Sequence, residues 1–212
     1  MERIVVLGAG GFGRETLDVI QAINSARPRW EIVGVIDDAP ASVQLDRLEA
    51  RGVPWLGALD TFLGSSAEPV WFTVAVGSPT ARRRLHARLE GAGHRPATLV
   101  HPAAHVGSQV SLAPGTIVCG GAQISTNVTI GVGGHVNPNA TVGHDSTLDD
   151  WVSINPAAVV SGDVTIGATS LVGAGAVILQ GLSIGEGALV GAAACVTRSV
   201  ESGRMVKGIP AR

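Results

Sequence analysis

An aliphatic residue recurs at every sixth position over nearly half of the chain. From Val106 to Val196, sixteen successive positions of this series hold Val, Ile or Leu without a miss. These three residue types make up 57 of the 212 residues. Chance would give such a run about once in 10⁹ trials, so the sequence predicts a β-helix of hexapeptide repeats.

The six-residue period also predicts how the repeats stack. An even period keeps every aliphatic anchor on the same face of its short strand. Three hexapeptides make a triangular coil of 18 residues, and coils stack at about the 4.8 Å strand spacing. Residues 18 apart therefore lie one above another, which places His144 beside Gly162 and His135 beside Ser153. Such prisms wind left-handed, against the usual crossover rule.

Composition agrees with a narrow prism. The chain has 29 glycines but only 3% aromatic residues. Glycine and asparagine relieve tight corners, where a positive φ is often required. A triangle this narrow holds about one aliphatic side chain per side, which explains the shortage of aromatic residues.

The distribution of charge separates a first domain from the repeat. Residues 1–100 hold 22 of the 32 charged side chains, whereas residues 101–201 hold seven. Strand-like and helix-like segments alternate before the boundary, which predicts a small parallel α/β sheet. The expected strands are 3–7, 31–36 and 70–76, and the expected helices are 14–24 and 80–90. We expect a Rossmann-like domain at 1–98, a left-handed β-helix at 99–203 and a C-terminal tail at 204–212.

Several functional classes fit the composition poorly. A net charge of −2 and the absence of tyrosine argue against a nucleic-acid partner. No apolar run reaches the ~18 residues that span a bilayer, so we expect no membrane segment and a cytoplasmic protein. Cys119 and Cys195 lie about four coils apart, too far for a disulfide, and are expected to be small buried hydrophobic residues.

The N-terminal segment contains a nucleotide-binding pattern. Gly8, Gly10 and Gly13 fit GxGxxG between a strand and a helix, and Asp37 ends the next strand. Such glycines let a pyrophosphate approach a helix N-terminus, and the acid can reach a ribose hydroxyl. The pattern alone would indicate NAD, but the chain offers no separate substrate domain for hydride transfer.

Six segments together identify a family resemblance. They are GAGGFGRE, VIDD, AVGSPTARRRL, HPAAHVG, NPNATVGHDSTLDDWVSINPAAVVSGDVTIG and VKGIPAR, with the hexapeptide series around them. The chain resembles, over nearly its whole length, the sialic-acid and nucleotide-sugar acetyltransferases. The resemblance implies acetyl-CoA as co-substrate, a nucleotide-sugar acceptor, and a homotrimer with the coenzyme in the groove between two prisms.

The resemblance also implies roles for individual residues. His144 matches the general base, and imidazole can accept a proton at neutral pH. Asp145 matches its acidic partner, Asn137 matches an active-site asparagine, and the Gly162 N–H is expected to hold the thioester oxygen as charge develops. The implied acetyl-CoA contacts are Ser153, Gly162, Ala174, Ala192 and Lys207, with Arg212 as a second cation. The implied nucleotide-sugar pocket is lined by Gly10, Gly11, Phe12, Asp37, Asp38 and Gly77.

Three features depart from that pattern or stay open. Ser153 stands where members of the family often carry a second histidine that contacts the donor, and His135 in the same column is a partial substitute. Arg82, Arg83 and Arg84 are expected on a solvated helix face. Trp151 is expected either to cover a neighbouring surface or pocket mouth, or to be exposed.

The sequence and the resemblance together favour an acetyl-CoA-dependent N-acetyltransferase acting on a nucleotide-linked amino sugar. The first alternative is an O-acetyltransferase acting on a sugar hydroxyl, as with sialic acid. A second is a non-catalytic trimer that binds a nucleotide-sugar. A zinc hydratase needs three converging histidines, and the middle of the prism offers only His135 and His144, so we expect no metal site.

Overall fold

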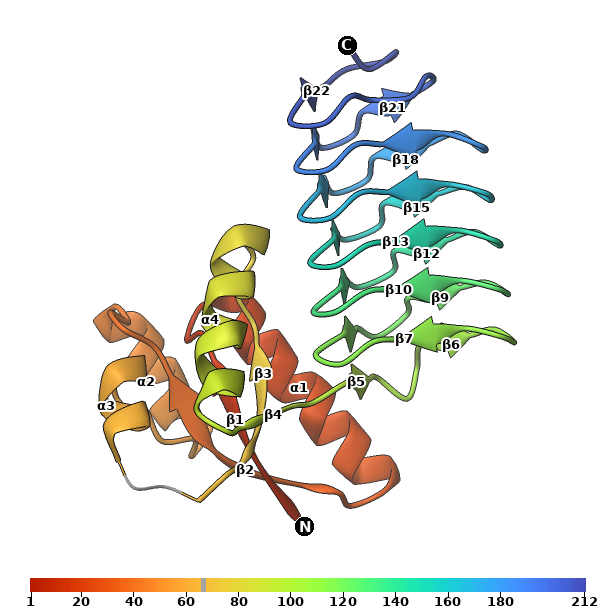
Figure 1. Ribbon diagram of the computed structural model, residues 1–212. Helices are drawn as coiled ribbons and strands as arrows, with labels where there is room; N and C mark the ends of the chain where they lie inside the picture. Colours follow the sequence, from red (N-terminus) through yellow and green to blue (C-terminus); the bar gives the residue numbers. More distant parts are fainter. Residues whose placement is uncertain (66–67) are drawn as a thin grey trace. The chain divides into compact units, whose positions relative to one another are not determined.

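The computed structural model describes residues 1–65 and 68–212 as two compact units, Met1–Ala97 and Thr98–Arg212. In Figure 1 the first unit contains all of the helices, and the second is a stack of similar coils running from green to blue. The fold class predicted for the whole chain, a small α/β unit followed by a left-handed parallel β-helix, is confirmed.

The first unit is built on a four-stranded parallel sheet with the strand order β2-β1-β3-β4. The predicted parallel α/β arrangement is therefore confirmed, since β1 pairs in parallel with β2 and β3, and β3 pairs in parallel with β4. The elements are β1 (Glu2–Leu7), α1 (Gly11–Ala26), β2 (Trp30–Ile36), α2 (Ser42–Glu49), α3 (Leu59–Gly64), β3 (Trp71–Val74), α4 (Pro79–Gly91) and β4 (Arg95–Pro96).

The sequence did not predict two helices of this unit, α2 and α3. Both are short, and Leu48 is the one fully buried residue of α2, so neither shows a clear apolar stripe. The Gln44 side chain accepts a hydrogen bond from the Ala41 N–H at 2.8 Å and closes the first turn of α2. Helix α1 also begins three residues before the predicted start, directly after the glycine loop.

Two histidines are buried in the first unit. The Nδ1 of His94 accepts a hydrogen bond from the Val70 N–H at 3.3 Å, and its ring lies 5.2 Å from Phe62. His86 meets the Phe72 ring edge-on at 5.0 Å, and Glu90 lies 3.9 Å away. Burial lowers the pKa of His94 below its usual value. Burial also lowers the pKa of His86, against the opposing charge of Glu90.

These histidines predict that the first unit loses stability in mild acid. A folded-state pKa below the unfolded value of about 6.5 means that the unfolded chain binds more protons. The stabilisation is therefore present above about pH 6.5 and falls as the pH drops below it. Three of the four tryptophans lie in this unit, so tryptophan fluorescence during thermal unfolding at pH 8 to 5 measures the effect. The double variant His86→Gln/His94→Asn should flatten this dependence, and an unchanged slope contradicts the assignment.

The second unit is a three-sided prism of two-residue parallel strands. We name its sides by their number of strands. The seven-stranded side contains β5 (Leu99–Val100), β8 (Ile117–Val118), β11 (His135–Val136), β14 (Ser153–Ile154), β17 (Leu171–Val172), β20 (Leu189–Val190) and β22 (Met205–Val206). The six-stranded side contains β6 (His105–Val106), β9 (Gln123–Ile124), β12 (Thr141–Val142), β15 (Val159–Val160), β18 (Val177–Ile178) and β21 (Cys195–Val196). The five-stranded side contains β7 (Ser111–Leu112), β10 (Thr129–Ile130), β13 (Thr147–Leu148), β16 (Thr165–Ile166) and β19 (Ser183–Ile184).

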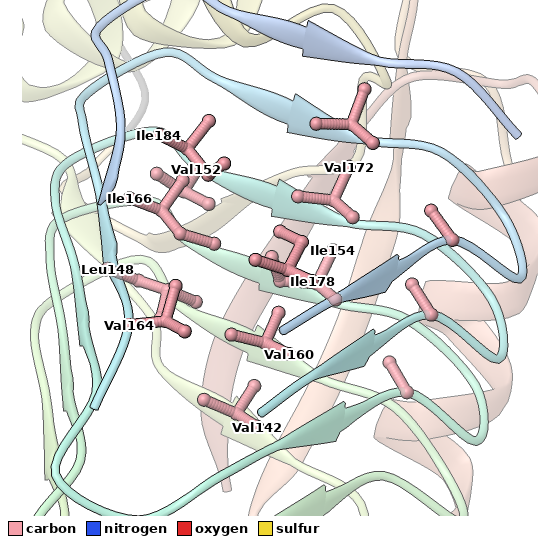
Figure 2. Packing of buried hydrophobic residues seen from close by; sticks show 14 of the residues in the cluster. Val142, Leu148, Val152, Ile154, Val160, Val164, Ile166, Val172, Ile178 and Ile184 are labelled. Carbon is pink, nitrogen blue, oxygen red and sulfur yellow. The ribbon is translucent and has the colours of Figure 1, made fainter. Parts of the chain in front are cut away.

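The aliphatic anchors form the core of the prism. All sixteen predicted anchors are the second residue of a strand, and those from Val118 to Val196 are at most 2% exposed. Figure 2 shows Val142, Val160 and Ile178 stacked along the six-stranded side, pointing inward. Full burial of such a side chain contributes about 1.5–3 kcal/mol. The series begins one hexapeptide earlier than predicted, since Val100 in β5 also packs against this core.

Each side ends in an edge where the chain turns sharply. The first edge follows the seven-stranded side, the second follows the six-stranded side and the third follows the five-stranded side. Every residue three positions after an anchor, from Gln109 to Ala193, has φ between 55° and 77°. Six of these fifteen residues are glycine, and four are Asn127, Asn139, Asp145 and Asp163, the types that tolerate this region best.

The predicted columns are confirmed by the strand register. His135 pairs with Ser153 and Ser153 with Leu171, each 18 residues apart. The last turn differs, because Ile184 bridges to Val200 and Leu189 pairs with Met205, which are 16 residues apart. Beyond β22 the chain folds back, and the Ala211 N–H donates a hydrogen bond to the Cys195 carbonyl at 2.7 Å. Both cysteines are free, with Cys119 buried and Cys195 half-buried rather than buried as expected.

Candidate active site

His144 and Asp145 form a hydrogen-bonded pair on the second edge of the prism. The Nδ1 of His144 lies 2.7 Å from Asp145 Oδ2, and both side chains are about half exposed. Asp145 has φ 60°, so the left-handed turn brings its carboxylate back toward the preceding ring. Its other oxygen, Oδ1, accepts a hydrogen bond from the Asn127 amide at 3.0 Å, one coil below.

The hydrogen bonds around Asp145 define the chemistry of the histidine. The Asn127 amide first, and the His144 ring second, hold the pKa of the Asp145 carboxyl below its usual range. The carboxylate is therefore ionised at neutral pH and accepts from Nδ1, which leaves Nε2 as the atom that can take a proton. The 18-residue spacing predicts Asn127 as the neighbour of Asp145 one coil below, although no functional role was predicted for it.

Gly162 lies directly above the histidine, as the column spacing predicts. A Cβ placed on Gly162 would approach His144 Nε2 to 2.5 Å, so only glycine leaves room for the ring. Within residues 1–65 and 68–212, the Gly162 N–H has no hydrogen-bond partner. A free N–H beside a proton acceptor can stabilise negative charge that develops next to that acceptor.

Asn137 lies apart from His144 within one chain. It belongs to the first edge, one side of the prism away, and is 7% exposed. Its amide nitrogen donates to the Ile154 carbonyl at 2.9 Å and lies 3.3 Å from the Asn155 Oδ1. The structure thus joins His144, Asp145 and Gly162 but leaves Asn137 outside that group.

All but one of the residues expected to contact acetyl-CoA lie on or beside the first edge. Ser153 is buried on the seven-stranded side, next to His135 in the strand register. Ala174 and Ala192 occupy equivalent exposed positions on the first edge, and the Ala193 N–H donates to the Ala174 carbonyl. Lys207 follows β22 and is exposed. Of this set, only Gly162 lies on the second edge.

A cluster of arginines near the end of the prism was not predicted beyond Arg212. A cavity of about 410 Å³ is lined by Arg198, Arg204 and Arg212 around an apolar floor of Val200, Val206 and Ala211, with Ser199 and Glu201 beside them. Lys207 is not among the lining residues. The three guanidinium groups take part in no ion pair among the residues that the structure describes.

The glycine loop of the first unit borders a second cavity. This cavity, of about 340 Å³, is lined by Gly8, Gly10, Gly11, Phe12, Asp37, Ala39, Gln44, Ala75, Val76 and Gly77. A Cβ on Gly10, Gly11 or Gly77 would meet nothing within 4 Å, so the loop leaves open space there. Gly13 instead packs tightly, because its Cβ would come within 1.8 Å of the Gly8 carbonyl oxygen.

Helix α1 starts at this cavity without a side-chain cap or an acidic residue in its first turn. The N–H groups of its first turn and its dipole favour a negatively charged ligand. Asp37 accepts hydrogen bonds from the Ala9 and Ala39 N–H groups at 2.8 and 3.0 Å and so shapes the loop. Asp38 does not line the cavity, because its carboxylate binds the Leu59 N–H at the start of α3.

The prediction that the three arginines lie on a solvated helix face is wrong for Arg82. Arg83 and Arg84 are exposed, but Arg82 is 1% exposed, and its Nη1 donates to the Val76 carbonyl at 3.0 Å. Burial lowers the pKa of Arg82 to about 9. The helix periodicity turns this one arginine inward, where it binds the carbonyl of Val76, a residue that lines the glycine-loop cavity.

Trp151 is also settled by the structure. It is 8% exposed and lies over Gly133, whose Cβ would come within 2.2 Å of the indole. The expectation of an exposed side chain is therefore wrong.

Among the described residues, no group of three His, Cys, Asp or Glu side chains is placed to hold a metal ion. None of the described helices combines the length and apolar character needed to cross a membrane.

Comparisons with known proteins cover both units. The family model described as the PglD N-terminal domain matches residues 3–89. None of the curated protein sequences is significantly similar to the chain. Solved structures are similar over its whole length. The acetyltransferase domain of PglB from Neisseria gonorrhoeae FA1090 has 29% identity and a TM-score of 0.87, covering 100% of this chain and 99% of that one.

Two further structures have the same architecture. WeeI from Acinetobacter baumannii AYE has 29% identity, a TM-score of 0.85 and coverage of 100% and 99% of the two chains. PerB from Caulobacter crescentus, in complex with CoA and GDP-perosamine, has 27% identity, a TM-score of 0.85 and coverage of 100% and 97%. The PglB domain has also been solved with acetyl coenzyme A. With a PglD-type first unit and a hexapeptide prism of the same form as these structures, the chain is similar over its whole length to the left-handed β-helix sugar acetyltransferases.

Proposed function

We propose that this protein is an acetyl-CoA-dependent N-acetyltransferase that acts on the amino group of a nucleotide-linked amino sugar. The observation that carries the proposal is the arrangement on the second edge. The Nδ1 of His144 is held by an ionised Asp145, while its Nε2 faces Gly162. A poised proton acceptor and a free N–H thus lie side by side, as direct acyl transfer requires.

The proposed reaction is a direct attack on the thioester. The sugar amine attacks the thioester carbonyl carbon, forming a C–N bond, and gives its proton to His144 Nε2. Asp145 holds the Nδ1–H and stabilises the imidazolium. The Gly162 N–H donates to the oxygen that gains negative charge. The C–S bond then breaks, and the coenzyme A thiolate leaves and takes the proton from His144.

The proposed donor path follows the first edge and the end of the prism. Ala174 and Ala192 are small and exposed, which leaves room for the pantetheine arm beside the backbone. Ser153 is near this path and offers a hydroxyl, and Asn137 lies on the same edge. Lys207 and the Arg198, Arg204 and Arg212 cluster supply positive charge for the coenzyme A phosphates.

The proposed acceptor site is the glycine-loop cavity. Gly10, Gly11, Phe12, Asp37 and Gly77 line it, and the uncapped start of α1 favours the diphosphate of a nucleotide-sugar. Asp38 supports this site indirectly through α3. An amine acceptor is favoured over a hydroxyl because perosamine N-acetyltransferase, with its CoA and GDP-perosamine, shares the whole fold.

A matched pair of acceptors tests the proposal. The purified protein is incubated with acetyl-CoA and UDP-, GDP- or dTDP-linked 4-amino sugars, and with the corresponding 4-hydroxy sugars, and free coenzyme A thiol is measured. We expect thiol release with at least one amino sugar and none with its hydroxy partner. Transfer only to hydroxy sugars would establish the O-acetyltransferase. If no sugar is acetylated although the protein binds a nucleotide-sugar, it is a binding module.

A further inference from the structure

Asn127 contacts the pair formed by His144 and Asp145, yet the proposed reaction gives it no role. It lies on the second edge, one coil below Asp145, and its amide nitrogen donates a hydrogen bond to Asp145 Oδ1 at 3.0 Å. The other carboxylate oxygen, Oδ2, lies 2.7 Å from His144 Nδ1. The carboxylate is therefore held at both oxygens, by an amide below it and by the imidazole beside it.

The backbone of the two corners places these side chains. Asn127 and Asp145 both have left-handed conformations, with φ of 57° and 60°. The Asn127 N–H donates to the Ser108 carbonyl at 3.0 Å, and the Asp145 N–H donates to the Thr126 carbonyl at 3.1 Å, so each corner is bonded to the coil below it. Two short side chains on fixed corners have little conformational freedom to lose when they meet, which favours this bond although both residues are exposed.

The amide of Asn127 determines which oxygen of Asp145 faces the histidine. An aspartate carboxylate turns about two side-chain bonds and can direct either oxygen toward a neighbouring ring. With Oδ1 engaged by the amide, Oδ2 is the oxygen that accepts from the imidazole Nδ1–H. The ring then presents Nε2 toward Gly162 as the nitrogen that can take a proton.

The same amide keeps the carboxylate charged. Its hydrogen bond contributes more than that of His144 to holding the pKa of the Asp145 carboxyl below its usual range. An ionised carboxylate stabilises the imidazolium that forms when Nε2 takes a proton. Since an amide does not titrate, Asn127 donates this hydrogen bond equally well in acid and in base.

The contact is confined to the coil that carries the histidine. The same corner is occupied by Gln109 one coil below Asn127 and by Asp163 one coil above Asp145. Within the described ranges 1–65 and 68–212, neither of these two side chains makes a hydrogen bond or an ion pair. The bond from Asn127 is therefore not a general feature of these corners, and Gln109 offers a matched control for it.

We propose that Asn127 is a positioning residue for acyl transfer, acting through Asp145 to hold the His144 imidazole with its proton on Nδ1 and with Nε2 open. The effect on turnover rests on the proposed function, because it requires that His144 accept the proton of the attacking group. The position of the proton on the ring does not depend on that function and can be observed directly.

Kinetics of two glycine variants test the effect on turnover. Asn127→Gly removes the amide from a corner that glycine also occupies in this column, at Gly181. We expect kcat for thiol release to fall about 10-fold, on the scale of a displaced catalytic group, with the KM values for acetyl-CoA and for the sugar unchanged. Gln109→Gly removes an exposed amide from the corner below and should keep the wild-type kcat. An unchanged kcat in Asn127→Gly, or an equal loss in Gln109→Gly, would overturn the proposal.

A double variant tests whether Asn127 acts through the carboxylate. Asp145→Gly removes the acceptor of the amide, again at a corner that accepts glycine. Adding Asn127→Gly to it should cause no further loss of kcat, because the amide then has no carboxylate to orient. A further large loss would show that Asn127 acts on the reaction by another route and would refute the positioning role.

The nitrogen resonances of the ring give a readout that needs no substrate. In the full-length protein labelled with ¹⁵N at histidine, the His144 signals, assigned by their loss in His144→Ala, show which nitrogen carries the proton. With the ring in its neutral form, the wild type and Gln109→Gly should carry the proton on Nδ1, and Asn127→Gly should carry more of it on Nε2. An unchanged proton position in Asn127→Gly would overturn the proposal. A wild type that acetylates no sugar refutes the proposed function instead, and the proton position still decides whether Asn127 orients the ring.

Discussion

Replacing His144 by alanine is expected to lower kcat by at least about 10²-fold, the usual contribution of a positioned general base. The KM for acetyl-CoA should change little, because the imidazole lies on the second edge and the donor path follows the first. The measurement is steady-state kinetics of thiol release with the preferred nucleotide-sugar.

Matched variants distinguish the loss of the base from a general disturbance of the second edge of the prism. Gln180→Ala changes an exposed residue of the same column, two coils above His144, and should keep full activity. Asp145→Asn retains a residue type that tolerates the left-handed corner while removing the carboxylate, so its kcat should lie between those of the wild type and His144→Ala. Near-normal turnover of His144→Ala would refute the assignment of the base.

Gly162→Ala is expected to give the second large loss of activity, without loss of the fold. Its Cβ would lie 2.5 Å from His144 Nε2, so the ring must leave the place where it accepts a proton. The backbone itself accepts alanine at this position of the repeat, since Ala168, Ala174 and Ala192 occupy it in other coils. We expect kcat to fall by about 10-fold or more, on the scale of a misplaced catalytic group.

Thermal unfolding supplies the control for Gly162→Ala. The melting temperature should stay within a few degrees of the wild type, because an exposed ring can rotate into solvent. The double variant His144→Ala/Gly162→Ala should be no less active than His144→Ala alone, since both act through one imidazole. A further large loss in the double variant would mean that Gly162 acts on catalysis by a separate route.

Periodicity predicted the prism well because one rule repeats there. Each anchor from Val118 to Val196 is buried in the core, and 18-residue spacing places Gly162 over His144 without any structural information. Side-chain partners inside a corner follow no such rule. The bond from Asn127 to Asp145 depends on the left-handed turn, and the inward position of Asn137 depends on an amide contact with the next coil.

The first unit was harder to predict, since its elements are short and unlike one another. Helices α2 and α3 have too few buried residues to produce a periodic pattern. Arg82 shows a different limit, because a charged residue in a run of arginines gives no sign that the helix turns it inward. Trp151 likewise occupies a corner that favours glycine or asparagine, and the sequence pattern gives no sign that its indole packs over Gly133.

The shortened final turn has a consequence for how this protein avoids uncontrolled growth. A stack of identical parallel coils would present, at its last rung, a template on which any other copy could continue the ladder. Dropping two residues puts Val200 and Met205 out of step with the repeat, and the folded-back segment at Ala211 occupies backbone groups of β21. A regular coil arriving from another molecule finds no matching register there, so the tube resists the end-to-end polymerisation typical of fibrils.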